Sequence, residues 1–204
     1  MKQYETYKDS GIEWLGKVPG HWEVMRLKDY FSIGKGLPIT KDDLQDSGIS
    51  VISYGQIHAK TNTGVTIAQD LVRYVDASYL SSNPQSIVPK GGFIFADTSE
   101  DIEGSGNCIY QDREEKVFAG YHTEILFPRE SYDNKYLAYL FQNEDWRCQI
   151  RSSVYGIKVM SITKAILNRC SIILPPHSEQ ERIVEYLDAK CGDIDNRIEV
   201  LEKE

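Results

Sequence analysis

The C-terminal end of the chain constrains the fold most, because a heptad pattern follows two prolines there. Pro175-Pro176 prevent an earlier helix from continuing. Ser178 and Glu181 have the spacing of a capping box, which predicts a helix start. We expect one helix from Ser178 to Lys203, roughly 39 Å long at about 1.5 Å per residue. Its apolar residues are spaced alternately by three and four, at Val184, Leu187, Cys191, Ile194, Ile198 and Leu201.

These six residues, the seam, predict that the helix pairs with another helix. The helix ends the given sequence and is acidic outside its seam: from His177 to Glu204 there are nine acidic and four basic residues, a net charge of −5. Gly192 is the one weak position and costs about 1 kcal/mol relative to alanine. Parallel and antiparallel pairing both stay open, as does packing of the helix on its own domain.

The preceding region looks rich in β-strands. Short apolar runs separated by turn residues are expected to be strands at 49–52, 64–67, 92–96, 108–110, 117–119 and 124–127. Helical spacing follows over 133–151, and a further strand is expected at 170–174. Strands and helices do not alternate, so a doubly wound parallel sheet is not expected. We predict an α+β fold, with a β-rich domain over 1–176 and a coiled-coil-type helix over 177–204.

Composition narrows the class of protein. The chain has 204 residues, of which 41% are hydrophobic, enough for one domain with an appended element. It has neither a run of 18 apolar residues nor the features of a secretory signal, so we expect a cytoplasmic protein. The four cysteines and four histidines lack metal-ligand spacing, and free thiols are expected. The net charge of −8 argues against nucleic acid, but residues 147–178 contain five basic residues and no acidic one.

Two stretches at opposite ends of the chain resemble the specificity subunits of type I restriction-modification systems. One runs from Tyr7 to Gly16 and continues through Pro19, His21 and Trp22 to Val24, with Trp14, Leu15 and Trp22 as expected core anchors. The other is Leu174-Pro175-Pro176-His177-Ser178-Glu179-Gln180-Glu181-Arg182-Ile183, which is similar to the family's junction between recognition domain and spacer helix. The family usually has leucine where this chain has His177.

The resemblance implies a non-catalytic, DNA-reading subunit. Family members hold two target-recognition domains, each followed by a helix, and they recruit modification and restriction subunits. Those partners would bind S-adenosylmethionine, ATP and Mg²⁺, and no cofactor is expected on this chain. Because this sequence has one recognition unit and one helix, we expect either a half-size subunit or part of a longer one. A half-size subunit would dimerise through the seam and read a palindromic bipartite site.

Three polar segments are candidates for contact with double-stranded DNA. We expect base contacts from Tyr54, Gln56, Lys60 and Asn62 in the first segment, residues 54–62. The second segment, residues 97–107, offers Thr98, Ser99 and Asn107, although its three acidic residues repel phosphate. The third segment, residues 151–164, offers Arg151, Lys158 and Lys164, which suit phosphates.

Three alternatives stay open. A nuclease would need Asp97 or Asp101 together with the acidic residues of Glu114-Glu115-Lys116, which we interpret as an exposed turn between two strands. A methyltransferase is disfavoured, because Leu174-Pro175-Pro176-His177 lacks the polar first and aromatic last residues of an adenine-methylation motif. A scaffold or regulatory protein that pairs through its C-terminal helix fits the acidic charge.

Overall fold

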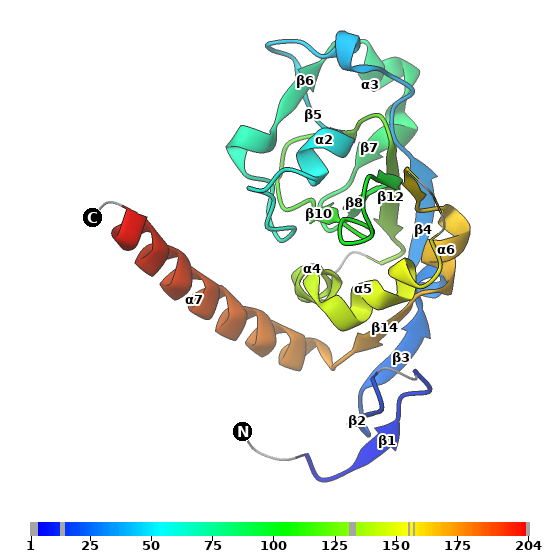
Figure 1. Ribbon diagram of the computed structural model, residues 1–204, viewed down its shortest axis with the longest axis vertical. Coiled ribbons are helices and arrows are strands. Elements are labelled where there is room, and N and C mark those ends of the chain that lie inside the picture. The colour runs from blue at the N-terminus through cyan, green and yellow to red at the C-terminus, as the bar shows by residue number, and fades with distance from the viewer. Residues whose placement is uncertain (1–3, 13–14, 131–133, 155, 157, 203–204) are drawn as a thin grey trace. The chain divides into compact units, whose positions relative to one another are not determined.

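A computed structural model of the chain describes residues 4–12, 15–130, 134–154, 156 and 158–202. It confirms the α+β class (Figure 1). The strands are β1 Tyr7–Asp9, β2 Lys17–Pro19, β3 Glu23–Arg26, β4 Phe31–Lys35, β5 Ile49–Ile52, β6 Arg73–Val75, β7 Ile87–Val88, β8 Phe93–Ala96, β9 Thr98–Ser99, β10 Cys108–Tyr110, β11 Val117–Ala119, β12 Thr123–Pro128, β13 Met160–Ser161 and β14 Ser171–Leu174. The α-helices are α1 Leu27–Tyr30, α2 Tyr54–Ile57, α3 Tyr79–Ser82, α4 Lys135–Gln142, α5 Glu144–Arg151, α6 Lys164–Arg169 and α7 His177–Glu202, and three short 3-10 helices are η1 Lys41–Asp43, η2 Gln69–Leu71 and η3 Pro84–Ser86.

The chain divides into two compact units. The central unit is Met25–Ile172, and the terminal unit joins Met1–Val24 to Ile173–Glu204. The N-terminal residues thus group with helix α7, whereas the sequence assigned them to the β-rich part that ends at Pro176. No helix in the described ranges is long and apolar enough to cross a membrane.

Two four-stranded sheets form the central unit. One sheet has the order β10-β8-β12-β4, and all of its strand pairs are antiparallel. The other has the order β6-β5-β11-β7, in which β11 runs parallel to β5 and the remaining pairs are antiparallel. A core cluster joins residues of both sheets, including Ile52, Val88, Ile94, Ile109, Val117 and Ile125.

Strand β8 is buried on both faces, which explains its uninterrupted apolar sequence. Ile94 and Ala96 belong to the core cluster shared by the two sheets. Phe93 and Phe95 alternate with them and pack on Phe141 of α4, with ring centroids 4.8 and 5.5 Å away. Helices α4 and α5 therefore cover the outer face of this sheet (Figure 1). The ring centroids of Phe141 in α4 and Trp146 in α5 are 4.3 Å apart.

One local prediction from the sequence is wrong, and the segment with helical spacing is divided more finely than that spacing indicates. Residues 64–67 do not form a strand, because Gly64 has a φ of +78° and donates its amide hydrogen to the side chain of Asn62. The helical segment 133–151 is two helices, because the Asn143 side chain accepts hydrogen bonds from the amides of Asp145 and Trp146 and starts a new helix. Three residues on which sequence predictions rest lie outside the described residues: Asp133, where the segment with helical spacing starts, Trp14, an expected core anchor, and Lys203, the expected end of the last helix.

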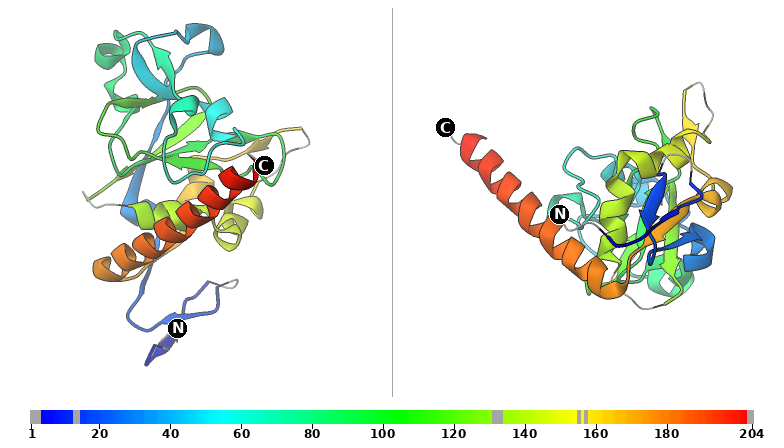
Figure 2. Two further views of the ribbon diagram at one scale, coloured as in Figure 1. Left: turned by 90° about the vertical axis from the view of Figure 1, so that its left-hand side faces the viewer. Right: turned by 90° about the horizontal axis from the view of Figure 1, so that it is seen from below.

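Helix α7 begins at His177, one residue before the predicted start. The Pro176 carbonyl accepts hydrogen bonds from the amides of Glu179 and Gln180, at 2.8 and 3.0 Å. Ser178 consequently lies in the first turn of the helix, and the predicted capping box is not the N-cap. From there α7 continues as one unbroken helix of 26 residues (Figure 2).

Candidate nucleic-acid interface

The three predicted DNA-contacting segments meet on the central unit. Strand β13, in the third segment, pairs with β9 in the second, so that Met160 lies opposite Ser99 and Ser161 opposite Thr98. The His58 ring, in the first segment, bonds through Nε2 to the Thr98 carbonyl at 2.9 Å. Segments whose contacting residues are 40 or more positions apart in sequence therefore share one surface.

A polar network fixes the orientation of His58. Since Nε2 faces a carbonyl, it carries the proton, and Nδ1 accepts a hydrogen bond from the Asn107 side-chain amide at 3.1 Å. The Asn107 side-chain oxygen in turn accepts a hydrogen bond from Arg147 of α5 at 2.8 Å. Both ends of the Asn107 amide are therefore engaged within the fold, so Asn107 positions its neighbours.

Beside this network is a pocket of about 500 Å³. It is lined by Tyr54, His58, Ser99, Glu100, Asp101, Glu103, Gly104 and Asn107. The Asp101 carboxylate accepts a hydrogen bond from the Gly104 amide at 2.6 Å, which shapes the loop. Burial, together with the nearby charge of Glu100, raises the pKa of Tyr54 above its usual value, so its hydroxyl keeps its proton. The pocket is thus rich in hydrogen-bond acceptors and negatively charged.

Several predicted contact residues have structural partners. Asn62 donates to the carbonyls of Ile57 and Cys108 and accepts from the Gly64 amide, so its side chain is used within the loop. Gln56 accepts a hydrogen bond from the Ser53 amide at the start of α2. The sequence patterns that suggest base contact, an amide on a polar loop, are the same patterns that stabilise such loops.

The basic residues of the third segment differ in their environments. Lys164 donates to the Ile33 carbonyl at 3.0 Å. Arg151 binds the Glu144 carboxylate and the backbone carbonyl of Glu103. Lys158 and, in the first segment, Lys60 are exposed. Tyr155 lies outside the described residues. Exposed lysines at this surface are suited to phosphate, since an ammonium group on a flexible stem adapts to a charged backbone.

Residues that the sequence did not single out also lie here. Lys35 of β4 bridges Asp97 and Glu124, with its Nζ 3.1 and 3.0 Å from their carboxylates. Burial raises the pKa of Glu124 above its usual value, although Lys35 opposes this effect. His58 lies within the first predicted segment, and Arg147 begins the acid-free basic stretch. The sequence positions of His58 and Arg147 therefore indicated that they could belong to the site. Their hydrogen bonds to Thr98 and Asn107 could not be predicted, because they join distant parts of the chain.

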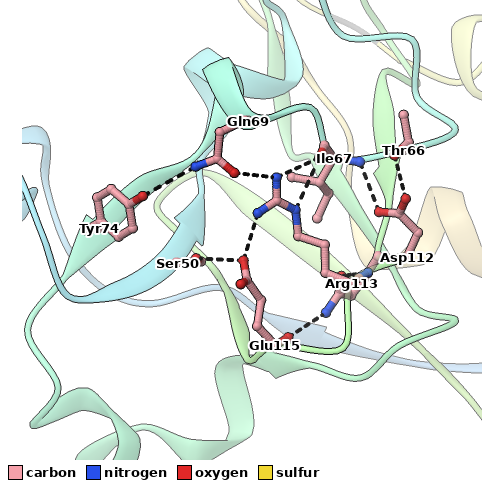
Figure 3. A network of polar contacts seen from close by, with 9 residues as sticks. Ser50, Thr66, Ile67, Gln69, Tyr74, Asp112, Arg113 and Glu115 are labelled. Atoms are coloured by element: carbon pink, nitrogen blue, oxygen red, sulfur yellow. Dashed lines mark hydrogen bonds and ion pairs between the residues drawn. The ribbon is translucent and has the colours of Figure 1, made fainter.

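The acidic residues of the nuclease alternative belong to separate networks, and Figure 3 shows the one that contains Glu115. Glu115 bonds to Arg113 at 2.8 Å and accepts a hydrogen bond from Ser50 at 3.1 Å, and the Arg113 hydrogen bond lowers the pKa of Glu115 below its usual value. Arg113 also donates to the Ile67 carbonyl. Asp97, by contrast, lies with Lys35, and Asp101 shapes the pocket loop. Residues 111–116 form the turn between β10 and β11, which confirms that interpretation of the sequence.

In the terminal unit, Glu179 of α7 joins the N-terminal segment to the helix. Its carboxylate accepts hydrogen bonds from the Tyr4 hydroxyl, from His21 Nε2 at 2.9 Å and from Trp22 Nε1 at 3.2 Å. Burial by itself would raise the pKa of Glu179, but these hydrogen bonds outweigh it and hold the pKa below its usual value. Glu179 is 9% exposed, so this clamp is a largely buried contact.

The apolar side chains of the predicted seam are exposed in the C-terminal half of α7. Ile194, Ile198 and Leu201 are 56%, 48% and 69% exposed, whereas Val184 and Leu187 are half-buried. Such large apolar exposure along one helix is typical of a surface that another chain covers. Within the terminal unit, Ile194, Ile198 and Leu201 are therefore not covered by the other described residues of that unit.

Several known proteins are similar to this chain in sequence or in fold. Two specificity subunits from Methanocaldococcus jannaschii, those of the type I restriction enzyme MjaVIII and the putative enzyme MjaX, are 25% and 24% identical over 99% and 98% of this chain. The chain spans about half of each, 45% and 46% of their lengths. The type I S subunit from M. genitalium superposes with a TM-score of 0.60 at 14% identity, covering 99% of this chain and 44% of that one.

The HsdS subunit from Thermoanaerobacter tengcongensis has the same fold, with a TM-score of 0.57 at 20% identity, and the match covers 93% of this chain and 41% of that one. Residues 19–203 match the type I restriction modification DNA specificity domain family over nearly the whole chain. Together with the recognition-type β-unit and the C-terminal helix, this match shows that the chain belongs to the family of type I restriction-modification DNA specificity domains.

Proposed function

We propose that this chain reads one half of a bipartite DNA site within a type I restriction-modification complex. The observation that carries the proposal is the convergence of three sequence-distant polar segments on one surface of a chain in this family. Loops of this kind, held by a rigid sheet scaffold, are where binding residues concentrate. Exposed Lys158 would contact phosphates, exposed Lys60 would contact bases, and Tyr54 would contact bases from the rim of the pocket.

Catalysis is assigned to partner subunits. Methyl transfer and DNA cleavage would occur on modification and restriction subunits, which would bind S-adenosylmethionine, ATP and Mg²⁺. A cytoplasmic location follows from that assignment. The acidic charge of the chain fits this division, because partners can supply much of the phosphate neutralisation that binding requires.

The exposed seam of α7 is proposed to pair with the same helix of a second copy. The chain spans about half the length of the curated relatives it matches, and this pairing would bring two copies of its recognition unit together. Identical domains related by a two-fold axis contact inverted half-sites, so the expected target is palindromic and bipartite.

The test is a binding selection from random duplex DNA, made with the chain alone and with its modification subunit. We expect weak binding by the chain alone at physiological salt, and enrichment of two inverted half-sites by the complex. If the complex enriches no sequence, the proposed function is wrong. Tight, sequence-specific binding by the chain alone would contradict the assigned role of the partner.

A further inference from the structure

The turn between the two sheets of the central unit contains a backbone conformation that side chains rarely adopt. His122, between β11 and β12, has a φ of 54° and is the one non-glycine residue with positive φ in the described ranges. This region is disfavoured for L-residues because Cβ approaches the backbone carbonyl, and glycine normally occupies it. His122 therefore adopts a conformation that glycine would adopt more readily.

The surrounding backbone imposes this conformation. The His122 carbonyl accepts a hydrogen bond from the Asp97 amide at 3.1 Å, and the Tyr121 carbonyl accepts one from the Tyr54 amide at 3.2 Å. The Thr123 hydroxyl donates to the Gly120 carbonyl at 2.7 Å. Position 122 contributes only its backbone to these bonds, so glycine would serve equally well, and what histidine adds is its ring.

The imidazole ring contributes little to packing, because 61% of the side chain is exposed. Its Nδ1 lies 3.4 Å from the Asp97 carboxylate, and its centroid lies 6.2 Å from that of Tyr54. In the tautomer that carries its proton on Nδ1, toward the Asp97 carboxylate, Nε2 of the imidazole is a hydrogen-bond acceptor. Tyr54 lines the acidic pocket, so His122 lies beside the rim of the surface where the three segments meet.

We propose that His122 is a specificity-determining residue whose Nε2 accepts a hydrogen bond from the exocyclic amino group of adenine or cytosine in the major groove. The inference rests on the proposed DNA-reading function. Adenine N6 and cytosine N4 are the amino donors of that groove. The carboxylates of Glu100, Asp101 and Glu103, which line the pocket beside Tyr54, make this surface rich in acceptors, which favours an amino donor and disfavours phosphate.

The test compares His122→Gly and His122→Asn with the unchanged chain, each in complex with the modification subunit. Glycine removes the ring and relieves the strained φ, whereas asparagine tolerates the conformation and both donates and accepts hydrogen bonds. For His122→Gly we expect an unchanged or higher Tm and unchanged affinity for random DNA. Preference for adenine or cytosine should fall about fivefold at one position of each half-site. His122→Asn should change the preference at that same position.

Three results would overturn the inference. The first is a motif that both variants leave unchanged at every position. The second is an equal loss of affinity for all DNA with a shallower salt dependence, which would indicate a phosphate contact. The third is a lower Tm for His122→Gly, which would indicate a structural role for the ring. If the unchanged complex enriches no motif, the proposed function fails and the inference fails with it.

Discussion

Replacing Glu179 by alanine should release the N-terminal segment from helix α7. The carboxylate accepts three hydrogen bonds, and a hydrogen bond to a charged group contributes about 1.5–3 kcal/mol. The sum overstates the effect, because Tyr4 is 39% exposed and the His21 side chain 46% exposed, and both would rebind water. We therefore expect a loss of about 2 kcal/mol from the local stability of the segment.

Hydrogen–deuterium exchange measures this loss directly. A change of about 2 kcal/mol corresponds to roughly 30-fold faster exchange of protected amides. The reporters are the amides of Gly20 and Trp22, which bond to the carbonyls of Thr6 and Pro19. The matched control is Glu181→Ala, two residues along the same helix, where the carboxylate side chain is 63% exposed. Glu181→Ala should leave the exchange unchanged.

The same contact predicts a pH dependence. Since the folded-state pKa of Glu179 is lowered, its contribution is complete above the ordinary value of 4.5 and disappears as the pH falls through the lowered pKa. Glu179→Ala should abolish this part of the acid sensitivity of exchange. If exchange in Glu179→Ala matched that of the unchanged chain, the β1–β2 hairpin alone would hold the segment, and the role given to Glu179 would be wrong.

Three further predictions concern the central unit and the seam. Asn62→Ala should lower the free energy of unfolding in urea by about 2 kcal/mol without altering the selected DNA motif, because the Asn62 side-chain amide is bonded within the loop. An altered motif at unchanged stability would instead mean that Asn62 contacts a base. Lys158→Ala should weaken binding to all sequences and reduce the slope of log affinity against log salt by about one, and a changed base preference at constant slope would contradict the phosphate role. Ile198→Asp should abolish dimers in analytical ultracentrifugation, whereas Val200→Asp, which alters an exposed apolar residue outside the seam, should not; equal effects would mean that the seam is not the interface.

Three short strands were predictable to the residue, and the apolar runs 92–96, 124–127 and 170–174 were predictable to within one residue at each end. The expected runs 49–52, 108–110 and 117–119 coincide with β5, β10 and β11. Each is short, apolar and bounded by turn residues, so the information lies within a few neighbouring positions. Residues 64–67 have similar composition but no strand, because the side chains of Asn62 and Arg113 take up backbone groups that a strand would have used.

The candidate interface was predictable as three segments but not as one surface. Nothing near Asn107 in the sequence indicates that its amide lies between His58 and Arg147, because those residues are 49 and 40 positions away. An amide on a polar loop has the same local pattern whether it contacts a base or a backbone carbonyl. Which of these occurs depends on the groups that strand pairing brings within hydrogen-bond distance.

The sequence by itself determined the helix α7, its apolar seam and the family of the chain, since heptad spacing and terminal motifs are local patterns that need no tertiary contact to exist. The tertiary structure decided which polar side chains are free for a ligand and which are already bonded. It also placed His122 at a positive φ, because the carbonyls of its turn bond to amides of Asp97 and Tyr54 from other parts of the central unit. Hydrogen-bond partners are chosen by distance in space, and sequence spacing does not encode that distance.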